Sequence, residues 1–572
     1  MTSMEQAPIA TRSLPALLLG AVIGAVIALL VLDPQFIRGT GGTWIHPKND
    51  LVAYLVAWNY YIVDRWRLPL FSIPAMSYPE GGNVLFNDAL PVAALATKVL
   101  YHATGARVNP YGWWVFLTYV LQGAAAARLV FAVGARSYWA AVAAAVFAII
   151  NIAFVARLGH TAVSSHFLIL WVLALYFDSL RRRRMLALES GAVLALTLLV
   201  NAYLFVMVSA FVGVTVATLW LRDQLTRRDG ARLGIALAVT LAVGILAGYG
   251  VLLTNPTTMK AQGFGHYSWN VGSLLLPPEG VFGFLANVPR DATHGQYEGE
   301  AFIGAGALFV FVLCLVSSPR KVAAAVARHW VYVAALAGFA AYAASNLVYV
   351  GDVLAVSYPL PAFLIDLGNY FRATGRFIWP LSYSLTILPL AGLFRWWPRL
   401  PAIVIALVAI VLQVQEAAPD LARRRGQMAQ PNEELIDTRL VESWLSKHQR
   451  VWQVPSWDCG GLGRSRRVWG SREANAELQV QLAAARLDVP INSVYTSRTF
   501  KDCAPEIAWA SDPRLDDGTL YLVGLASVAN TPQLSQLARS NACVTLDWGV
   551  VCSRSWLQTA EDRGLASDRR ER

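Results

Sequence analysis

Residues 14–32 of the chain read LPALLLGAVIGAVIALLVL, a run without a charged side chain that ends at Asp33-Pro34. A helix of about 20 such residues crosses the roughly 30 Å hydrocarbon core of a bilayer. The run is longer than the apolar core of a signal peptide and lacks a clear small-residue cleavage site, so we expect a retained membrane helix. Comparable runs recur as far as Glu416 and stop beyond Ala417.

The composition of the whole chain agrees with this pattern. Of its 572 residues, 56% are hydrophobic and 15% are charged, which is far from the average soluble domain. The formal net charge of +11 comes from Lys and Arg clusters between the apolar runs, and not from one basic face, so nucleic acid is not indicated as a partner. The sequence therefore predicts an α-helical polytopic membrane protein. Its expected spans, about eleven in number, cover residues 14–32, 111–133, 138–155, 162–180, 185–200, 204–221, 233–253, 302–316, 330–350, 377–394 and 401–415.

The basic clusters also predict the orientation of the chain. Residues 88–101 are apolar but short, and they contain Asp88 and Lys98, which suits a re-entrant or interfacial helix better than a span. If this segment does not cross, five Arg-containing loops share one side, and the positive-inside rule makes that side cytoplasmic. The expected outer stretches are then residues 35–109, 156–161, 201–203, 254–301 and 351–376 and everything after residue 416.

Residues 417–572 are predicted to form a small α/β domain outside the membrane, separate from a membrane domain of residues 1–416. Strand-like runs cover 450–455 and 519–525, and helix-like runs cover 477–487 and 532–540. Four of the five cysteines lie here, which favours two disulfides and an oxidising compartment, although three pairings are open and four reduced buried thiols are the alternative. A short hairpin with linked ends is expected at residues 543–552. The candidate cysteines are Cys459, Cys503, Cys543 and Cys552.

Two aspartates of the first outer stretch are candidate catalytic or binding groups. Asp50 lies in the segment His46-Pro47-Lys48-Asn49-Asp50, just before an aromatic amphipathic stretch expected to lie in the membrane interface. A carboxylate there can act as a general base toward a hydroxyl group, or simply cap the helix that follows it. Asp88 has the same two interpretations, and His46 is a further candidate substrate-binding residue.

The later outer stretches supply the other candidate binding residues. His160 and His166 flank the mouth of a span, and their spacing of six is not that of a metal-binding pair on one helical face; both can instead be merely solvated. Arg372 and Arg376 are four residues apart. If both lie within a helix, they share one face and can bind one phosphate together; otherwise they can extend to lipid headgroups. His266, Tyr267 and Glu298 belong to an outer loop whose aromatic and polar groups suit a sugar or an interfacial belt.

Together these features resemble GT-C-fold membrane glycosyltransferases of bacteria, and most closely an uncharacterised membrane family related to the YfhO-like proteins. The motifs that carry the resemblance are GHYSWN at residues 265–270, YEG at 297–299 and FRATGRF at 371–377. The resemblance implies transfer of a sugar from a polyprenyl-phosphate-linked donor to a glycan or lipid acceptor, on the outer face of the bacterial cytoplasmic membrane. It implies that Asp50 is the base, that Arg372 and Arg376 hold the lipid phosphate, and that His160 and His166 position the phosphate or the acceptor.

Two points stay open at this stage. Many GT-C enzymes have two adjacent acidic residues in the first loop, whereas here Asp50 follows Asn49; a divalent metal ion is therefore an open option, with Asp88 as a substitute partner, and no cofactor is assigned. The alternative functions are a transporter or flippase of a lipid-linked glycan and a non-catalytic envelope assembly factor. The near absence of charges inside the spans favours chemistry at the membrane surface over transport.

Overall fold

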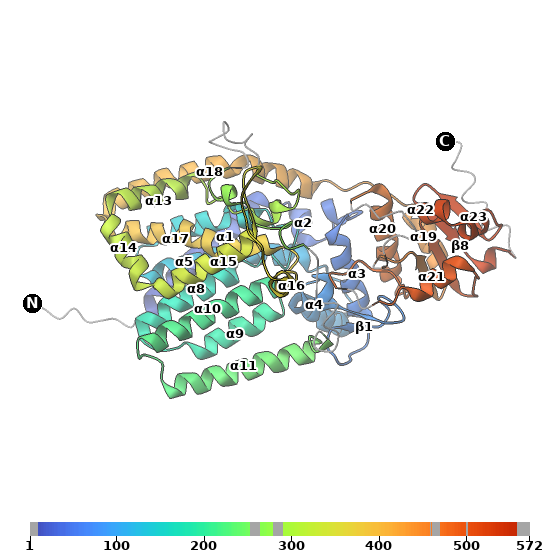
Figure 1. Cartoon of the computed structure of the whole chain (residues 1–572), viewed down its shortest axis with the longest axis horizontal. Coiled ribbons are helices and arrows are strands. Elements are labelled where there is room, and N and C mark those ends of the chain that lie inside the picture. Colours follow the sequence, from blue (N-terminus) through green and yellow to red (C-terminus); the bar gives the residue numbers. More distant parts are fainter. Residues whose placement is uncertain are drawn as a thin grey trace, which may run out of the picture. The chain divides into compact units, whose positions relative to one another are not determined.

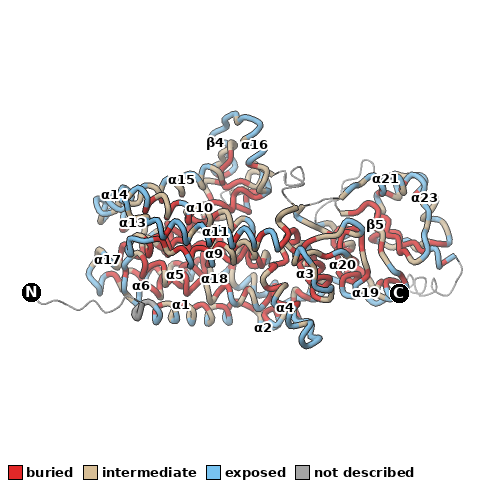
Figure 2. The backbone as a smooth tube through the Cα atoms, turned by 90° about the horizontal axis from the view of Figure 1, so that it is seen from below, coloured by how far each residue is buried: buried red, intermediate tan, exposed pale blue. Residues whose placement is uncertain are grey.

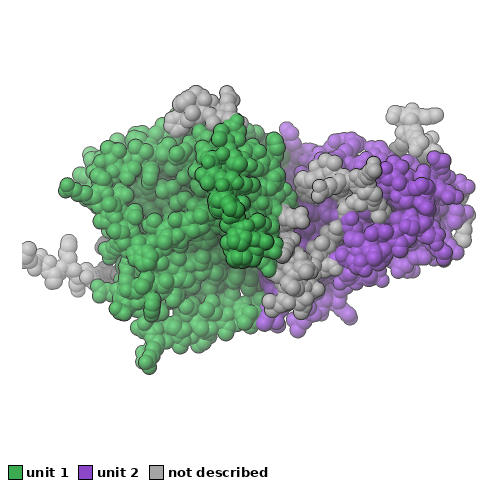
Figure 3. Space-filling model, viewed as in Figure 1, with its two compact units in different colours: residues 1–39, 111–244, 259–429 green, residues 40–110, 245–258, 430–572 purple. Residues whose placement is uncertain are grey.

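The computed structural model describes residues 10–251, 263–277, 290–457, 459, 470–498 and 501–557. The chain divides into two compact units, shown in separate colours in Figure 3. Unit 1 holds residues 1–39, 111–244 and 259–429, and unit 2 holds residues 40–110, 245–258 and 430–572. Unit 2 thus joins most of the predicted first outer stretch to the C-terminal region, whereas the sequence placed its domain boundary at residues 416–417.

Unit 1 consists mainly of long helices that run side by side (Figure 1). Helix α1 packs against α5 and α6, α10 against α8 and α9, and α13 against α17 and α18. The bounds are α1 Ala10–Val31, α2 Pro34–Arg38, α5 Tyr111–Val133, α6 Tyr138–Ile149, α7 Ile152–Val155, α8 Phe167–Arg182, α9 Ala187–Leu198, α10 Ala202–Leu221, α11 Arg227–Ala247, α13 Ala305–Ser317, α14 Pro319–Arg328, α15 Trp330–Ala344, α16 Ala362–Gly368, α17 Trp379–Trp396 and α18 Arg399–Ala429.

Six helices in the described part of the chain are long and apolar enough to cross a membrane, or seven if the bent pair α13–α14 forms one span. The chain is therefore a multi-pass membrane protein. Each predicted span contains a helix, but several of these helices are short, so the expected number of about eleven stays a prediction. The six spans are 14–31, 111–133, 202–221, 227–247, 374–396 and 399–429.

Small residues let the first two long helices approach closely. A Cβ atom at Gly20 would lie 2.3 Å from the carbonyl oxygen of Gly123, and one at Gly24 would lie 2.3 Å from that of Tyr119. Glycine therefore permits the contact between α1 and α5 that any larger side chain would block. Close packing of this kind is typical of membrane helices, which gain no hydrophobic free energy by leaving lipid.

One predicted span was wrong at its end. The sequence prediction continued the helix to Val350, but α15 stops at Ala344 and residues 347–350 form a strand. Ser345 has φ of 64°, which removes it from the right-handed helical region and ends the helix. Strand β3 (Leu347–Val350) then pairs antiparallel with β4 (Val353–Ser357) around Gly351-Asp352.

Unit 2 contains a four-stranded sheet with the order β5-β6-β8-β7. Strands β5 (Arg450–Val454) and β6 (Thr519–Val523) are parallel, and the hairpin of β7 (Cys543–Leu546) and β8 (Gly549–Cys552) continues the sheet antiparallel to β6. The predicted strand and hairpin positions are thereby confirmed. The helices around the sheet are α19 Thr438–Leu445, α20 Arg472–Arg486, α21 Ala504–Ser511, α22 Leu525–Asn530 and α23 Pro532–Ala538.

Residues 40–110 fold into the same unit as this sheet. Helix α3 (Asp50–Val63) packs between α4 (Pro91–Thr104) and α20, and eleven of its residues are buried. Its aromatic side chains therefore pack in protein, and the expectation that this stretch lies in the membrane interface was wrong. The Tyr60 hydroxyl donates to the carbonyl oxygen of Val489 at 2.6 Å, which ties α3 to the C-terminal segment. The short strands β1 (Ser72–Ile73) and β2 (Gly82–Asn83) pair beside it.

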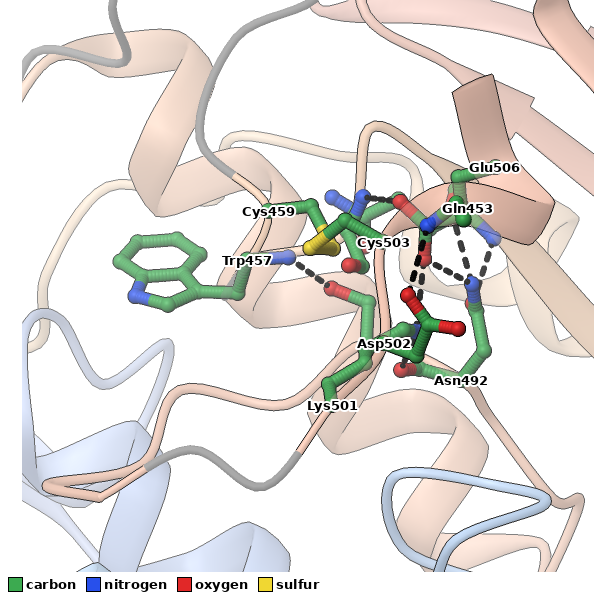
Figure 4. Close-up of a disulfide and its surroundings, with 11 residues drawn as sticks. Gln453, Trp457, Cys459, Asn492, Lys501, Asp502, Cys503 and Glu506 are labelled. Atoms are coloured by element: carbon green, nitrogen blue, oxygen red, sulfur yellow. Dashed lines mark hydrogen bonds and ion pairs between the residues drawn. A yellow bond between two sulfur atoms is a disulfide. The ribbon is translucent and has the colours of Figure 1, made fainter. Parts of the chain in front are cut away.

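The four cysteines of unit 2 form two disulfides, as predicted. Cys543 pairs with Cys552 across the β7–β8 hairpin, and Cys459 pairs with Cys503. Figure 4 shows the second bond beside a buried ion pair, in which Lys501 Nζ lies 2.6 Å from Glu506 Oε1. Asn492 donates to the same carboxylate at 3.0 Å, so this loop is held by covalent and polar contacts together.

Candidate functional site

Two buried arginines of unit 1 share one buried carboxylate. Glu298 accepts hydrogen bonds from Arg157 Nη1 at 2.5 Å and from Arg376 Nε and Nη2 at 3.0 and 3.1 Å. All three side chains are at least nine-tenths buried. Two guanidinium groups thus share the carboxylate of Glu298. Guanidinium groups form strong charge-assisted hydrogen bonds with carboxylates and phosphates, so such an arrangement can also bind an anionic ligand.

Local sequence explains how Glu298 and Arg376 meet. They lie on two short 3-10 segments, η6 (Gln296–Gly299) and η7 (Thr374–Ile378), which pack against each other. A Cβ at Gly375 would lie 2.8 Å from the Cα atom of Gly299, and a Cβ at Gly299 would lie 3.2 Å from the Cα atom of Gly375. Two glycines at the crossing therefore set the distance across which the ion pair forms.

The loop before Glu298 is fixed by an aspartate and a chain of amides. Asp291 Oδ1 accepts from the backbone N–H groups of Thr293, Gly295 and Gln296. The Gln296 side chain accepts from Asn270 Nδ2 at 2.9 Å, and Asn270 also bonds both polar backbone groups of Gly351. The predicted aromatic loop thus acts in part as a rigid support for Glu298. Residues 254–262 and 278–289 of that predicted outer loop lie outside the described residues.

Electrostatics keep Glu298 ionised. Burial alone raises the pKa of this carboxyl group, but the guanidinium groups of Arg157 and Arg376 lower it by more, so its pKa falls well below the ordinary value. His160 also lowers the pKa of Glu298, which places that histidine near the cluster. The cluster is therefore an ionic group at any physiological pH.

His166 presents a hydrogen-bond donor beside the cluster. Gln122 Nε2 donates to the Ala148 carbonyl oxygen at 3.2 Å and to the Tyr383 hydroxyl at 2.8 Å. The Tyr383 O–H is then left to donate to His166 Nδ1, 2.9 Å away. An imidazole that accepts at Nδ1 carries its proton on Nε2, and this Nε2 is buried with no hydrogen-bond partner among the described residues.

Further polar groups near Arg376 in the sequence also lack partners within the described structure. They are the hydroxyl of Thr374 and the indole N–H of Trp379, whose ring lies 4.1 Å from that of His166. Both groups can donate hydrogen bonds. These groups and His166 Nε2–H are donors of the kind that bind an oxyanion such as a phosphate.

Arg372 and Arg376 do not share a helical face, and that part of the prediction was wrong. The helical segment begins only at Thr374, so Arg372 precedes it. Arg372 is exposed and donates to the Tyr267 hydroxyl at 2.5 Å, with its guanidinium 4.6 Å from that ring centre. His266 is also exposed, and its ring lies against Tyr267 at 4.5 Å.

The remaining predicted residues belong to unit 2. Asp50 is the first residue of α3, after Asn49, whose side chain makes no capping hydrogen bond. His46 lies 4.0 Å from Glu434. Asp88 raises the pKa of Tyr249, which places the two side chains near each other.

The segments around Asp50 and Asp88 share an unusual backbone. His46, Asn49, Asp88 and Leu90 all have φ near +50°, a region that side chains other than glycine rarely adopt. Such conformations persist only where the surrounding structure imposes them, and they concentrate at functional sites. Asp88 therefore occupies a strained turn, and Asp50 directly follows one; both aspartates belong to unit 2.

Sequence reasoning missed Arg157, the second arginine of the cluster. The available signal was its position, since an arginine in the short outer stretch 156–161 opposes the positive-inside bias in the same way as Arg372 and Arg376. Among the described residues there is no cluster of three or more His, Cys, Asp or Glu side chains able to hold a metal ion.

The long apolar helices define the chain as a multi-pass membrane protein, and unit 1 contains a buried ionic cluster of two arginines and one glutamate. The chain belongs to the family described as Domain of unknown function (DUF6311), whose model matches residues 21–418. A comparison with curated proteins found no match.

A solved structure similar to the chain is the Archaeoglobus fulgidus oligosaccharyltransferase, tethered through a disulfide bond to an acceptor peptide with the NVT sequon. The two share 11% identity at a TM-score of 0.45, and the match covers 84% of this chain and 64% of that chain. With a TM-score below 0.5, the likeness by itself defines neither the fold nor the reaction.

Proposed function

We propose that the chain is a membrane glycosyltransferase of the GT-C type. It moves a sugar from a polyprenyl-phosphate-linked donor to a cell-envelope glycan or lipid acceptor on the outer face of the bacterial cytoplasmic membrane. The observation that carries this proposal is the buried cluster of Arg157, Glu298 and Arg376, together with His166, whose Nε2 is buried and has no hydrogen-bond partner among the described residues. Two guanidinium groups and an N–H donor are the groups that bind a lipid phosphate.

The proposed chemistry assigns separate roles to the two units. In unit 1, Arg376 and the His166 Nε2–H hold the phosphate and stabilise the charge that develops on it as the bond to the sugar breaks. Arg372, exposed beside Tyr267 and His266, contacts the donor at the entrance, and His160 helps to position the phosphate or the acceptor.

In unit 2, Asp50 accepts the proton of the acceptor hydroxyl, and Asp88 and His46 position the acceptor. A multi-pass arrangement with eleven crossings, and with residues 35–109, 254–301 and 417–572 outside the cytoplasm, belongs to the same proposal.

The test is the Asp50→Asn substitution in cells, with Glu80→Gln as the control, since Glu80 is exposed and unassigned in the same unit. We expect Asp50→Asn to lower the surface glycan product at least about 100-fold, the usual contribution of a general base, while the folded protein remains in the membrane. The lipid-linked donor should accumulate. Unchanged product from the Asp50→Asn variant would contradict the enzyme and favour an assembly factor.

A further inference from the structure

The hairpin β3–β4 and helix α16 form an apolar surface on unit 1 that no described element covers. All five residues of β4 are exposed, and four of them are Val353, Leu354, Ala355 and Val356. In α16 the exposed side chains include Phe363 (68%) and Leu367 (57%). We call residues 347–368 the apolar arm.

The pattern of β4 is unlike that of a hairpin in water. Successive strand residues point to opposite faces, so a solvated hairpin normally alternates apolar and polar side chains. Here the neighbours Val353 and Leu354 are both apolar and both exposed, so neither face of β4 is polar. From Val353 to Ile365 the sequence contains no Asp, Glu, Lys, Arg or His. An exposed apolar patch of this kind marks an interaction surface.

The position of the apolar arm identifies what covers it. The arm connects α15, an apolar helix, to the candidate span at residues 374–396, so it leaves and re-enters the helix bundle at one membrane face. In Figure 2 the long helices run roughly along the horizontal, while β4 and α16 project sideways from them. A segment that projects sideways at the end of a span lies along the plane of the membrane. The apolar arm is then next to the exposed apolar side chains of the membrane helices.

Backbone hydrogen bonding limits how deep the arm can lie. Within the described part of the chain this sheet has two strands and therefore open edges, and lipid-exposed open edges do not occur in the hydrocarbon region. At the boundary between headgroups and acyl chains, water and headgroups can satisfy those edges while the valine and phenylalanine side chains reach the acyl chains. The hairpin turn is fixed from the protein side, because Asn270 bonds both polar backbone groups of Gly351.

We propose that the apolar arm is a lipid-contacting element. Its side chains insert among the acyl chains just below the headgroups, on the outer face of the membrane that the chain spans. This proposal concerns bulk membrane lipid and does not depend on the proposed reaction. If that reaction also holds, the arm brings the chain segment that ends at Arg372 to the depth of a lipid-linked phosphate.

The test uses single cysteine variants of the full chain, Val356→Cys and Phe363→Cys, labelled with an environment-sensitive fluorophore in lipid nanodiscs. Cys314 is buried and the other cysteines are in disulfides, so the introduced thiol is the site of labelling. The lipid control is Val408→Cys on the exposed side of α18, and the aqueous control is Gln536→Cys on α23.

We expect lipids with a quencher near the headgroup to quench both arm probes several-fold more than a water-soluble quencher does. The Val408 probe should respond best to a quencher deeper in the chain, and the Gln536 probe only to the aqueous one. Arm probes that behave like Gln536 would overturn the proposal. Arm probes protected from both quenchers would also overturn it, and would indicate a protein partner or a second copy.

Discussion

At the scale of single residues, the Glu298 carboxylate stabilises the buried guanidinium groups of Arg157 and Arg376. Replacing Glu298 with glutamine keeps the side-chain shape but removes the negative charge opposite Arg157 and Arg376. Breaking a buried ion pair from one side costs about 3–5 kcal/mol, because the remaining charge is left uncompensated. We expect Glu298→Gln to lower the midpoint of thermal unfolding in detergent strongly, and Glu80→Gln, an exposed control, to leave it unchanged.

The pH dependence of this effect has a defined sign. The pKa of Glu298 is lower in the folded protein than its ordinary value of 4.5. Such a group stabilises the fold above its unfolded pKa, and the contribution is lost as the pH falls through the folded pKa. The difference in midpoint between the wild type and Glu298→Gln should therefore stay constant from neutral pH to about pH 5 and shrink only in stronger acid. A difference that disappears near neutral pH would mean that Glu298 is not held as a carboxylate.

The sequence predicted several cluster residues but not their geometry. Arg376 and His166 were identifiable because they lie at the outer ends of apolar runs, and Glu298 because it lies in an outer loop rich in aromatic and polar residues. The expected pairing of Arg372 with Arg376 failed because the helix begins two residues after Arg372. The pairing of Glu298 with both Arg157 and Arg376 joins three segments far apart in the sequence, and no local pattern encodes such a contact.

At the scale of elements, the crossing of η6 and η7 depends on two glycines. A methyl group at Gly375 would meet the backbone of Gly299 at 2.8 Å, so Gly375→Ala must push the two segments apart. We expect this variant to weaken the Glu298–Arg376 pair and to lower both thermal stability and glycan product. Gly338→Ala in α15 is the matched control, since nothing lies within 4 Å of its added methyl group. Equal behaviour of the two variants would contradict the tight crossing.

The two disulfides of unit 2 should differ in their contributions to stability. They close loops with sequence separations of 44 and 9 residues. On the chain-entropy model the longer loop is worth about 4 kcal/mol and the shorter about 2.5 kcal/mol. Paired serine substitutions at Cys459 and Cys503 should therefore destabilise unit 2 more than those at Cys543 and Cys552, as followed by denaturant unfolding. The reverse order would show that strain or residual structure dominates.

Sequence periodicity predicted most elements because it reports burial directly. The strands at 450–455 and 519–525 and the hairpin at 543–552 were recognisable from short apolar runs bounded by turn residues. Strand β3 was not, since its Leu-Val-Tyr-Val sequence continues the apolar run of α15 and only the backbone at Ser345 interrupts it. Helix α3 was predicted as a helix, but its aromatic residues could not reveal whether lipid or protein covers them.

At the scale of the whole molecule, orientation in the membrane is the next prediction. The positive-inside rule places α23 outside the cytoplasm and the basic loop of α14 inside. In intact spheroplasts we expect a membrane-impermeant thiol reagent to label Gln536→Cys, and to label Lys321→Cys only after the membrane is opened. Labelling of Lys321→Cys in intact cells would invert the topology and remove the basis for an outer-face reaction.

The division into units could not be predicted from the chain in linear order. The sequence separated a membrane domain from a C-terminal domain at residues 416–417, because the apolar runs stop there. The structure instead folds residues 40–110 together with residues 430–572. Contacts such as that of Tyr60 with Val489 link positions hundreds of residues apart, and only the folded chain displays them.

The central claim is that the cluster of Arg157, Glu298 and Arg376 binds a lipid phosphate. The most direct measurement is an electron cryo-microscopy map of the full chain in nanodiscs saturated with a polyprenyl phosphate. We expect phosphate density within hydrogen-bonding distance of Arg376 and His166 Nε2. A bound polyprenyl phosphate whose headgroup lies elsewhere, with the cluster unchanged and without an anion, would contradict it.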